Sequence, residues 1–164
     1  MATHEPPNME NLREMALELI KGQNTMTLAT TCDNTAWAAP VYYANREFRF
    51  YFFSDPTSRH IRETLKTNQA AAAIFSLAAT WREIRGIQMS GTVSQVSPGL
   101  EALQVIRIYL QKFSFTREFF DSPQELDLTA FITRFRVRLY LFRPLLLYYL
   151  NNQIRFGFRE EIPL

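Results

Sequence analysis

The chain has a single cysteine, Cys32, so it can form neither an internal disulfide nor a cysteine-cluster metal site. It also has only two histidines, His4 and His60, which lie far apart in the sequence and argue against a catalytic metal. A lone thiol fits a reducing compartment, and we expect a cytoplasmic protein. The polar, proline-rich residues Met1–Pro7 are not followed by a long apolar segment, so no signal peptide is expected.

Other absences exclude further classes of protein. The apolar segment Leu139–Leu150 contains Arg143 and Pro144 and is too short to span a bilayer, so no membrane partner is expected. The net charge is +2 with both signs interspersed, which argues against a nucleic-acid partner. The sequence contains neither Gly-x-Gly-x-x-Gly nor a Walker pattern, and this argues against a doubly wound nucleotide-binding fold.

Aromatic residues are abundant. They make up 14% of the chain, with 14 Phe and 7 Tyr, and all hydrophobic residues together make up 47%. A chain of 164 residues can therefore build one core, and we expect a single domain over 1–164 in which 1–8 is a loose tail. One copy of this size does not readily bury so much ring surface, and this predicts a homodimer as the partner.

Local patterns predict a mainly antiparallel α+β fold. We expect helices over 9–21, 56–67, from 98 to about 113, and 123–134. We expect strands over 25–31, 36–44, 47–53, 70–77, 81–97, 136–142, 145–150 and 154–158. Short turns between strands favour an antiparallel sheet, and a small barrel would hide its edges.

A few residues predict details of these elements. Pro40 places its strand at an edge or a bulge, and Gly86 and Gly91 predict a bulge, a bend or a close backbone approach in the long strand. Ile61 and Leu65 are expected to face inward from their helix.

The strongest chemical signal is the segment Phe52–His60. An aromatic strand ends there, and Asp55-Pro56 is typical of the N-cap and first position of a helix. Ser58, Arg59 and His60 follow at once, and a helix N-terminus with a hydroxyl, a guanidinium and an imidazole suits a phosphate. The segment therefore indicates a phosphorylated cofactor, although Arg59 and His60 also fit ordinary exposed residues of a first helical turn.

Four segments, in their order and spacing, resemble the FMN-binding split-barrel superfamily of pyridoxamine 5'-phosphate oxidase, in its uncharacterised bacterial branch. They are Thr-Met-Thr-Leu-Ala-Thr (25–30), Trp-Ala-Ala-Pro-Val-Tyr-Tyr (37–43), Phe-Arg-Phe-Tyr-Phe-Phe-Ser-Asp-Pro-Thr-Ser-Arg-His (48–60) and Arg-Gly-Ile-Gln-Met-Ser-Gly (85–91). The resemblance covers about 20–97. It implies a six-stranded antiparallel split β-barrel with flanking helices, a homodimer, and FMN held in a groove between subunits.

The resemblance also implies cofactor-binding positions. The matching residues are Thr27, Leu28, Thr30, Phe53, Ser54, Ser58, Arg59, His60 and Gln88. Threonines at 25 and 30 stand where the oxidase has basic residues, and Gly86 stands at its flavin-contacting glutamine, with Gln88 two residues on and on the same strand face. The substrate-binding C-terminus of the oxidase has no match, so oxidation of pyridoxamine phosphate is not expected.

Two classes of function follow. The first is an FMN-dependent oxidoreductase acting on a small molecule, with a nicotinamide as a possible redox partner; no catalytic side chain is identified. The second is a non-enzymatic split barrel that binds haem, a deazaflavin or another planar ligand, or a ligand-free dimeric stress or interaction protein. Trp37, Trp81 and the phenylalanines of Phe113–Phe120 fit core or dimer contacts better than a cofactor site.

Overall fold

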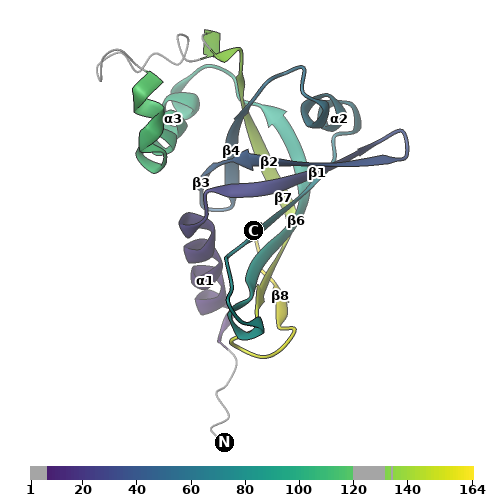
Figure 1. Cartoon of the computed structure of the whole chain (residues 1–164), viewed down its shortest axis with the longest axis vertical. Helices are drawn as coiled ribbons and strands as arrows, with labels where there is room; N and C mark the ends of the chain where they lie inside the picture. The colour runs from purple at the N-terminus through teal and green to yellow at the C-terminus, as the bar shows by residue number, and fades with distance from the viewer. Residues whose placement is uncertain (1–6, 120–131, 134) are drawn as a thin grey trace, which may run out of the picture.

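The computed structural model describes residues 7–119, 132–133 and 135–164 (Figure 1). The helices are α1 (Met9–Gly22), α2 (Arg59–Thr67) and α3 (Leu100–Lys112), with 3₁₀ turns η1 (Trp81–Glu83) and η2 (Ser114–Phe119). The strands are β1 (Thr25–Cys32), β2 (Thr35–Tyr42), β3 (Ala44–Arg46), β4 (Arg49–Ser54), β5 (Ala70–Phe75), β6 (Arg85–Gln95), β7 (Arg138–Asn151) and β8 (Arg159–Glu161).

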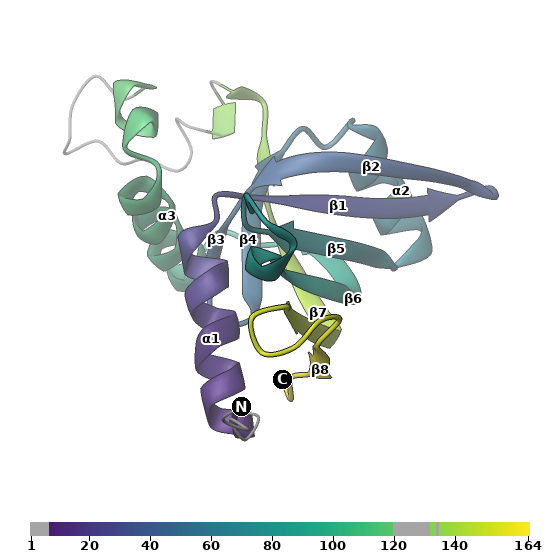
Figure 2. The ribbon, with the colours of Figure 1, turned by 60° about the horizontal axis from the view of Figure 1, so that its bottom comes forward.

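The strands form one antiparallel sheet that curls into a half-barrel. Their order is β2-β1-β5-β6-β7-β4-β3, and β8 pairs with β7. Figure 2 shows the sheet curving, with α1 and α2 near opposite ends of it. The split-barrel prediction is confirmed: six longer strands form the barrel, and β3 and β8 are additions of three residues each. Pro40 lies on β2 at the sheet edge, as predicted.

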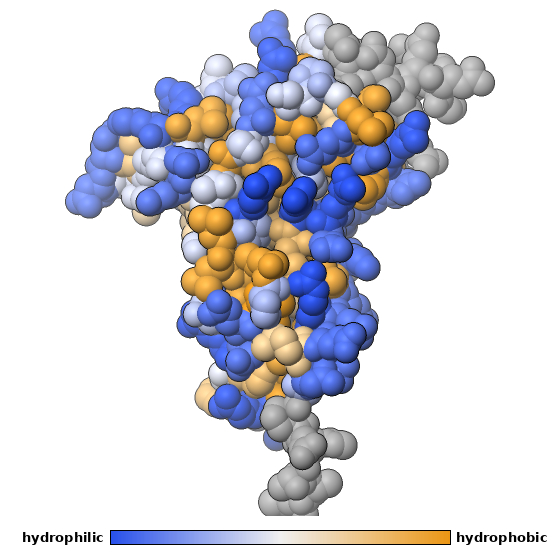
Figure 3. Space-filling view, turned by 180° about the vertical axis from the view of Figure 1, so that it is seen from behind, coloured by the Kyte–Doolittle hydropathy of each residue, from blue (hydrophilic) through white to orange (hydrophobic). Residues whose placement is uncertain are grey.

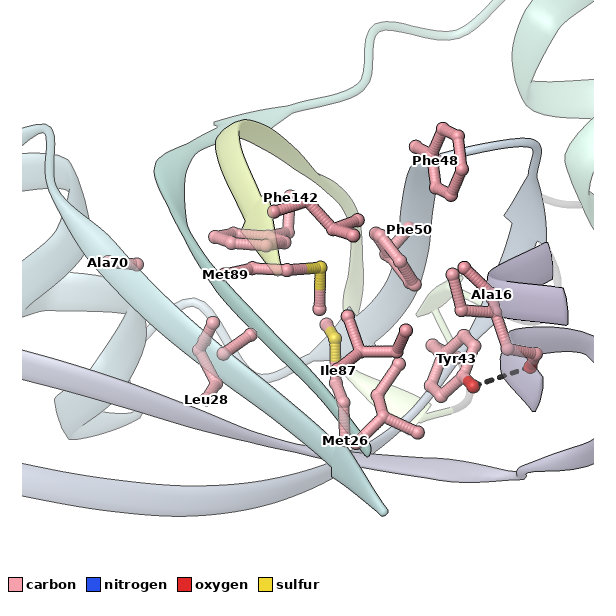
Figure 4. Packing of buried hydrophobic residues seen from close by; sticks show 14 of the residues in the cluster. Ala16, Met26, Leu28, Tyr43, Phe48, Phe50, Ala70, Ile87, Met89 and Phe142 are labelled. Carbon is pink, nitrogen blue, oxygen red and sulfur yellow. Dashed lines mark hydrogen bonds between the residues drawn. The ribbon is translucent and has the colours of Figure 1, made fainter. Parts of the chain in front are cut away.

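The main core fills the concave face of the sheet. Strand alternation directs one set of side chains inward, and α1 adds its apolar stripe to them (Figure 4). Fully buried members include Leu28, Phe50 and Phe142. Burying a side chain of this size contributes about 1.5–3 kcal/mol. Tyr43 extends the core to the end of α1, where its hydroxyl donates to the carbonyl of Ile20 at 2.6 Å.

Helix α3 packs on the convex side of β4 and β7. Ala102 and Val105 contact the outward side chains of Tyr51, Leu139 and Leu141, and the Tyr51 hydroxyl donates to Glu101 at 2.7 Å. At the other end of α3, Lys112 Nζ donates to the carbonyl of Gln23 at 2.6 Å, just beyond α1. Burial lowers the pKa of this lysine to about 8.

The structure corrects the start of the second predicted helix. It begins at Arg59 with Ser58 as N-cap, not at Pro56 with Asp55 as N-cap. The Asp55 carboxylate instead accepts hydrogen bonds from the amide and hydroxyl of Thr57, both at 2.7 Å. An Asp side chain that closes such a local turn competes with helix initiation. Leu65 was also wrong as an inward residue, because it is 53% exposed and Ile61 and Thr64 form the buried face.

Other predicted boundaries also change. The two strands predicted over 136–142 and 145–150 form the single strand β7, and 154–158 is turn rather than strand. The strand predicted over 47–53 is shorter, because Glu47 adopts a left-handed conformation (φ 49°) in a turn between β3 and β4. The strand predicted from 81 begins with η1, and α3 begins at Leu100. Most of the helix predicted over 123–134 lies outside the described residues.

The bulge predicted at Gly91 is confirmed. The β6–β7 register shifts between Ser90 and Gly91, because Ser90 pairs with Leu146 and Gly91 pairs with Pro144. Leu145 is therefore the extra residue, and the bulge lets β7 continue through a proline that cannot donate to the ladder. A Cβ on Gly91 would lie 2.1 Å from the Arg143 carbonyl oxygen and 2.8 Å from Pro144 Cα, so only glycine fits.

Gly91→Ala should destabilise the protein, because backbone atoms cannot move aside as a flexible side chain can. We expect the free energy of unfolding to fall by about 2–3 kcal/mol in urea titrations followed by circular dichroism. Gly22→Ala is the control, since nothing lies within 4 Å of the added Cβ. If Gly91→Ala and Gly22→Ala are equally stable, the close approach of the Arg143 and Pro144 backbone does not restrict position 91 to glycine.

Candidate functional site

The connection from β4 to α2 folds back on itself and gathers polar side chains. Ser54, the last residue of β4, points inward and is 8% exposed. The turn closed by Asp55 returns the chain, and the amide of Ser58 donates to the Asp55 carbonyl at 3.0 Å. Ser58 and the first turn of α2 therefore lie beside Ser54.

Ser54, Ser58 and His60 form what we call the Ser–His cluster. His60 Nε2 lies 2.8 Å from Ser54 Oγ and 3.3 Å from Ser58 Oγ, and the two hydroxyl oxygens are 3.2 Å apart. Burial lowers the pKa of His60 below its ordinary range, although the nearby Glu63 carboxylate opposes this shift. The imidazole is therefore neutral at neutral pH, and the cluster is a set of hydrogen-bonding groups without net charge.

The N-terminus of α2 adds backbone donors to the cluster. Ser58 is the N-cap, but its side chain makes no capping hydrogen bond to the helix. The first amide groups of a helix have no intrahelical acceptor, and they carry the positive end of the helix dipole. With two hydroxyls and an imidazole beside them, these amides suit an oxyanion such as a phosphate.

Arg59 is held in a second network on the other side of the same helical turn. Its Nε donates to Glu63 Oε1 at 2.6 Å, and the other carboxylate oxygen, Oε2, accepts from the buried Thr30 hydroxyl. The guanidinium stacks over Trp37, 4.7 Å from the ring centroid. The Thr30 hydrogen bond, and after it the Arg59 hydrogen bond, lowers the pKa of Glu63, so this carboxylate is ionised. A phosphate that binds Arg59 must therefore share it with Glu63.

The convex face of the sheet offers a surface of different character. Strand register places Thr27, Ala73, Gln88 and Tyr148 in one row across β1, β5, β6 and β7. Ala29, Ala71, Ser90 and Leu146 form the next row. A groove of about 610 Å³ runs beside this second row; its lining includes Ala29, Ala71, Ser90, Leu145 and Asn68. The short side chains leave room for a flat ligand.

Apolar residues next to these rows stay exposed. Phe75, on the same face of β5, is 66% exposed, and Leu145 at the bulge is 70% exposed. Figure 3, which shows the molecule from behind, has apolar side chains gathered across the middle of that side and bordered by polar ones. Exposed apolar area of this kind is typical of a surface that contacts a ligand or another protein.

The structure divides the predicted site residues among three environments. Ser54, Ser58, Arg59, His60 and Thr30 surround the first turn of α2. Thr27 and Gln88 share a row on the convex face.

The last two predicted residues pack inside the protein. Leu28 is fully buried, so only its backbone can meet a ligand. Phe53 packs edge to face against Tyr109 of α3, with ring centroids 5.1 Å apart.

Glu63 was not predicted, although it is central to the geometry. Its i,i+4 spacing from Arg59 was a sequence signal for the pairing, but the contact with Thr30 depends on the docking of α2 against β1. Trp37 lies opposite Thr30 in the β1–β2 register, which explains why it reaches Arg59. Trp81 lies elsewhere and packs against Phe156 at a centroid distance of 5.5 Å.

Two negative findings concern the described part of the chain. Among those residues, no three His, Cys, Asp or Glu side chains gather in a way that could hold a metal ion. None of the described helices is long and apolar enough to cross a membrane.

Known proteins of similar structure are varied. A haem-binding protein from Mycobacterium smegmatis superposes with a TM-score of 0.71 at 16% identity. The superposition covers 96% of this chain and 59% of that protein, so this chain spans about three fifths of the length of that protein. An FAD-binding protein from Mesorhizobium loti superposes with a TM-score of 0.59 at 15% identity, covering 82% of this chain and 90% of the other. These likenesses establish the fold.

Sequence comparison identifies the family. A UPF0306 protein from Klebsiella pneumoniae (strain 342) is 28% identical over 111 residues, which are 66% of this chain and 74% of that protein. The sequence profile described as pyridoxamine 5'-phosphate oxidase matches residues 12–134, well over half of the chain. The chain therefore belongs to the pyridoxamine 5'-phosphate oxidase family.

Proposed function

We propose that the protein is a homodimeric flavoprotein that binds FMN and acts as a flavin-dependent oxidoreductase on a small molecule. The observation that carries the proposal is the convergence of Ser54, Ser58 and His60 with the free amides at the start of α2. Hydroxyls, an imidazole and helix amides are the partners that a phosphate monoester needs.

Two sets of residues offer the kinds of partner that FMN needs, one for its phosphate and one for its ring. The Ser–His cluster would hold the phosphate, with Arg59 contributing the guanidinium nitrogens that Glu63 does not engage. The row of Thr27, Ala73 and Gln88 on the convex face would receive the ring, with the side-chain amide of Gln88 for its polar edge. The threonines at positions 25 and 30 do not supply the positive charge that basic residues would give at these positions.

When bound, a flavin would supply the hydride or electron transfer itself. The chain's part is to bind and orient it. Thr27, Gln88 and Ser90 are neutral, so they can donate or accept hydrogen bonds at the ring edge but cannot act as acids or bases at neutral pH. A small redox partner such as a nicotinamide would approach over the exposed side chains of this face.

A second copy of the chain is the partner that the convex face fits. Its short side chains permit close approach of another sheet, and Phe75 and Leu145 would lose their exposure to water. Burying each of them contributes about 1.5–3 kcal/mol to association before the entropic cost is subtracted.

Haem is the second candidate, supported by the structural neighbour that is named as haem-binding. His60 is the histidine available in the described chain, but its Nε2 is already bonded to Ser54. A Soret band that disappears in His60→Gln would favour haem, whereas a yellow protein or quenched FMN fluorescence would favour flavin.

Arg59→Gln should weaken FMN binding by about tenfold or more, the range expected for one charge-assisted hydrogen bond. Glu63→Gln should have the opposite effect, because it frees Arg59 and removes a negative charge from the site. Fluorescence titration of FMN measures both variants, with Arg107→Gln on the exposed face of α3 as control. Equal affinities of wild type and Arg59→Gln would contradict a phosphate contact at Arg59.

FMN affinity should rise as the pH falls from about 8 to 6.5. Free His60 has a lowered pKa, and a bound phosphate dianion would raise it, so binding takes up a proton in this range. The measurements are calorimetry at several pH values and NMR titration of the imidazole. In His60→Gln, FMN affinity should vary less with pH than in the wild type. A pH profile in that variant equal to that of the wild type would rule out proton uptake at His60.

Ala73→Arg should shift the protein from dimer to monomer in native mass spectrometry. The residue is exposed, so the long cation does not disturb the core but obstructs a second sheet on the convex face. Gln111→Arg on α3 is the matched control. A dimer that persists in Ala73→Arg would place the interface elsewhere.

A further inference from the structure

A second polar pocket lies between α2 and the β1–β2 turn. It has a volume of about 350 Å³, and we call it the α2 pocket; it is lined by Cys32, Asp33, Thr35, Arg59, Arg62, Glu63 and Lys66. Three of these residues are cations at i, i+3 and i+7 on one face of the helix. Since an α-helix rises 1.5 Å per residue, the cations extend over about 10 Å of α2.

The acceptors of the pocket are already engaged. Asp33 receives both of its contacts from Lys66 Nζ, at 3.0 and 3.1 Å, and these contacts lower the pKa of its carboxyl. Glu63 is bonded by Thr30 and Arg59. Both carboxylates are therefore ionised and paired with donors from the protein.

Donors remain in excess. The side chain of Arg62 makes no hydrogen bond or salt bridge with any described residue, and the side chain of Arg59 makes one hydrogen bond, through Nε. The lining has one net positive charge, because it contains the three cations Arg59, Arg62 and Lys66 and the two carboxylates Asp33 and Glu63. A pocket with surplus N–H donors and satisfied carboxylates suits a ligand rich in acceptors and negative charge.

The α2 pocket and the proposed phosphate site share Arg59. This residue lines the pocket, and it directly precedes His60 of the Ser–His cluster. A ligand whose first phosphate lies at the N-terminus of α2 can therefore continue along the helix toward Arg62 and Lys66.

We infer that the α2 pocket binds a second phosphoryl group, so that the site accepts a dinucleotide as well as a mononucleotide. The inference rests on the proposed function for the position of the first phosphate. The ligand is either FAD as the bound flavin or a nicotinamide dinucleotide that occupies the same first-phosphate position in place of the flavin. One structural neighbour is named as FAD-binding, which agrees with the first source.

Calorimetry with FMN, FAD, NADPH and ADP tests the inference on the full chain. Wild type should bind FAD or NADPH at least about tenfold more tightly than Arg62→Gln/Lys66→Gln does, while FMN affinity stays the same in both. ADP, the phosphate-bearing fragment, should show the same loss. Lys21→Gln/Arg107→Gln removes two exposed charges elsewhere and is the control, with circular dichroism to verify folding.

Asp33→Asn should change dinucleotide affinity in the opposite direction. It releases Lys66 and removes a negative charge, and asparagine tolerates the left-handed backbone at this position (φ 50°). Dinucleotide affinity should therefore increase severalfold. If Arg62→Gln/Lys66→Gln loses FAD binding but keeps NADPH binding, the ligand of the α2 pocket is FAD. If it loses NADPH binding but keeps FAD binding, the ligand is the nicotinamide dinucleotide.

Unchanged affinity of every dinucleotide in Arg62→Gln/Lys66→Gln overturns the inference, as does an equal loss for FMN, which would indicate a general charge effect. If FMN binds and dinucleotides show no dependence on these residues, the proposed function survives alone. If no flavin binds but ADP binding depends on Arg62 and Lys66, the pocket stands and the flavoprotein proposal fails.

Discussion

One buried carboxylate links α2 to β1. Glu63 accepts from the Thr30 hydroxyl of β1 and from Arg59 one helical turn earlier, so it joins strand and helix beside the buried Ile61. A buried charge is costly unless it is fully paired, and both oxygens of Glu63 have partners. The same interaction that fixes the helix on the barrel therefore also decides how much of Arg59 remains for a ligand. Fold and site are coupled at this residue.

Most of the fold could be predicted because its information is local. Period-two alternation and β-branched or aromatic residues identified the six barrel strands, and a proline and a glycine identified an edge and a bulge. The errors arose where a contact with a residue distant in the sequence, or a competing local hydrogen bond, determined the local structure. The bulge at Leu145 lets β7 pass through Pro144, and Asp55 closes a turn instead of capping a helix.

The site was predictable only in part, and strand parity explains why. Neighbouring residues in a strand point to opposite faces, so Phe53 and Ser54 cannot both direct side chains to one ligand. Phe53 accordingly packs under α3, whereas Ser54 joins His60. Thr27 and Thr30, an odd number of residues apart, are divided in the same way. By contrast, Ser54, Ser58 and His60 lie within seven consecutive residues, and a single turn brings them together.

The same parity links the proposed cofactor to the proposed dimer. The groups proposed to bind phosphate lie at the start of α2, but the open surface proposed for a ring lies on the convex face, which water reaches freely in one copy. Hydrogen bonds from Gln88 or Thr27 would there compete with water and discriminate little between ligand atoms. A second copy over Phe75 and Leu145 would remove that water and strengthen those bonds in a medium of lower dielectric constant. Selective binding of a planar ring by this face therefore requires a covering partner.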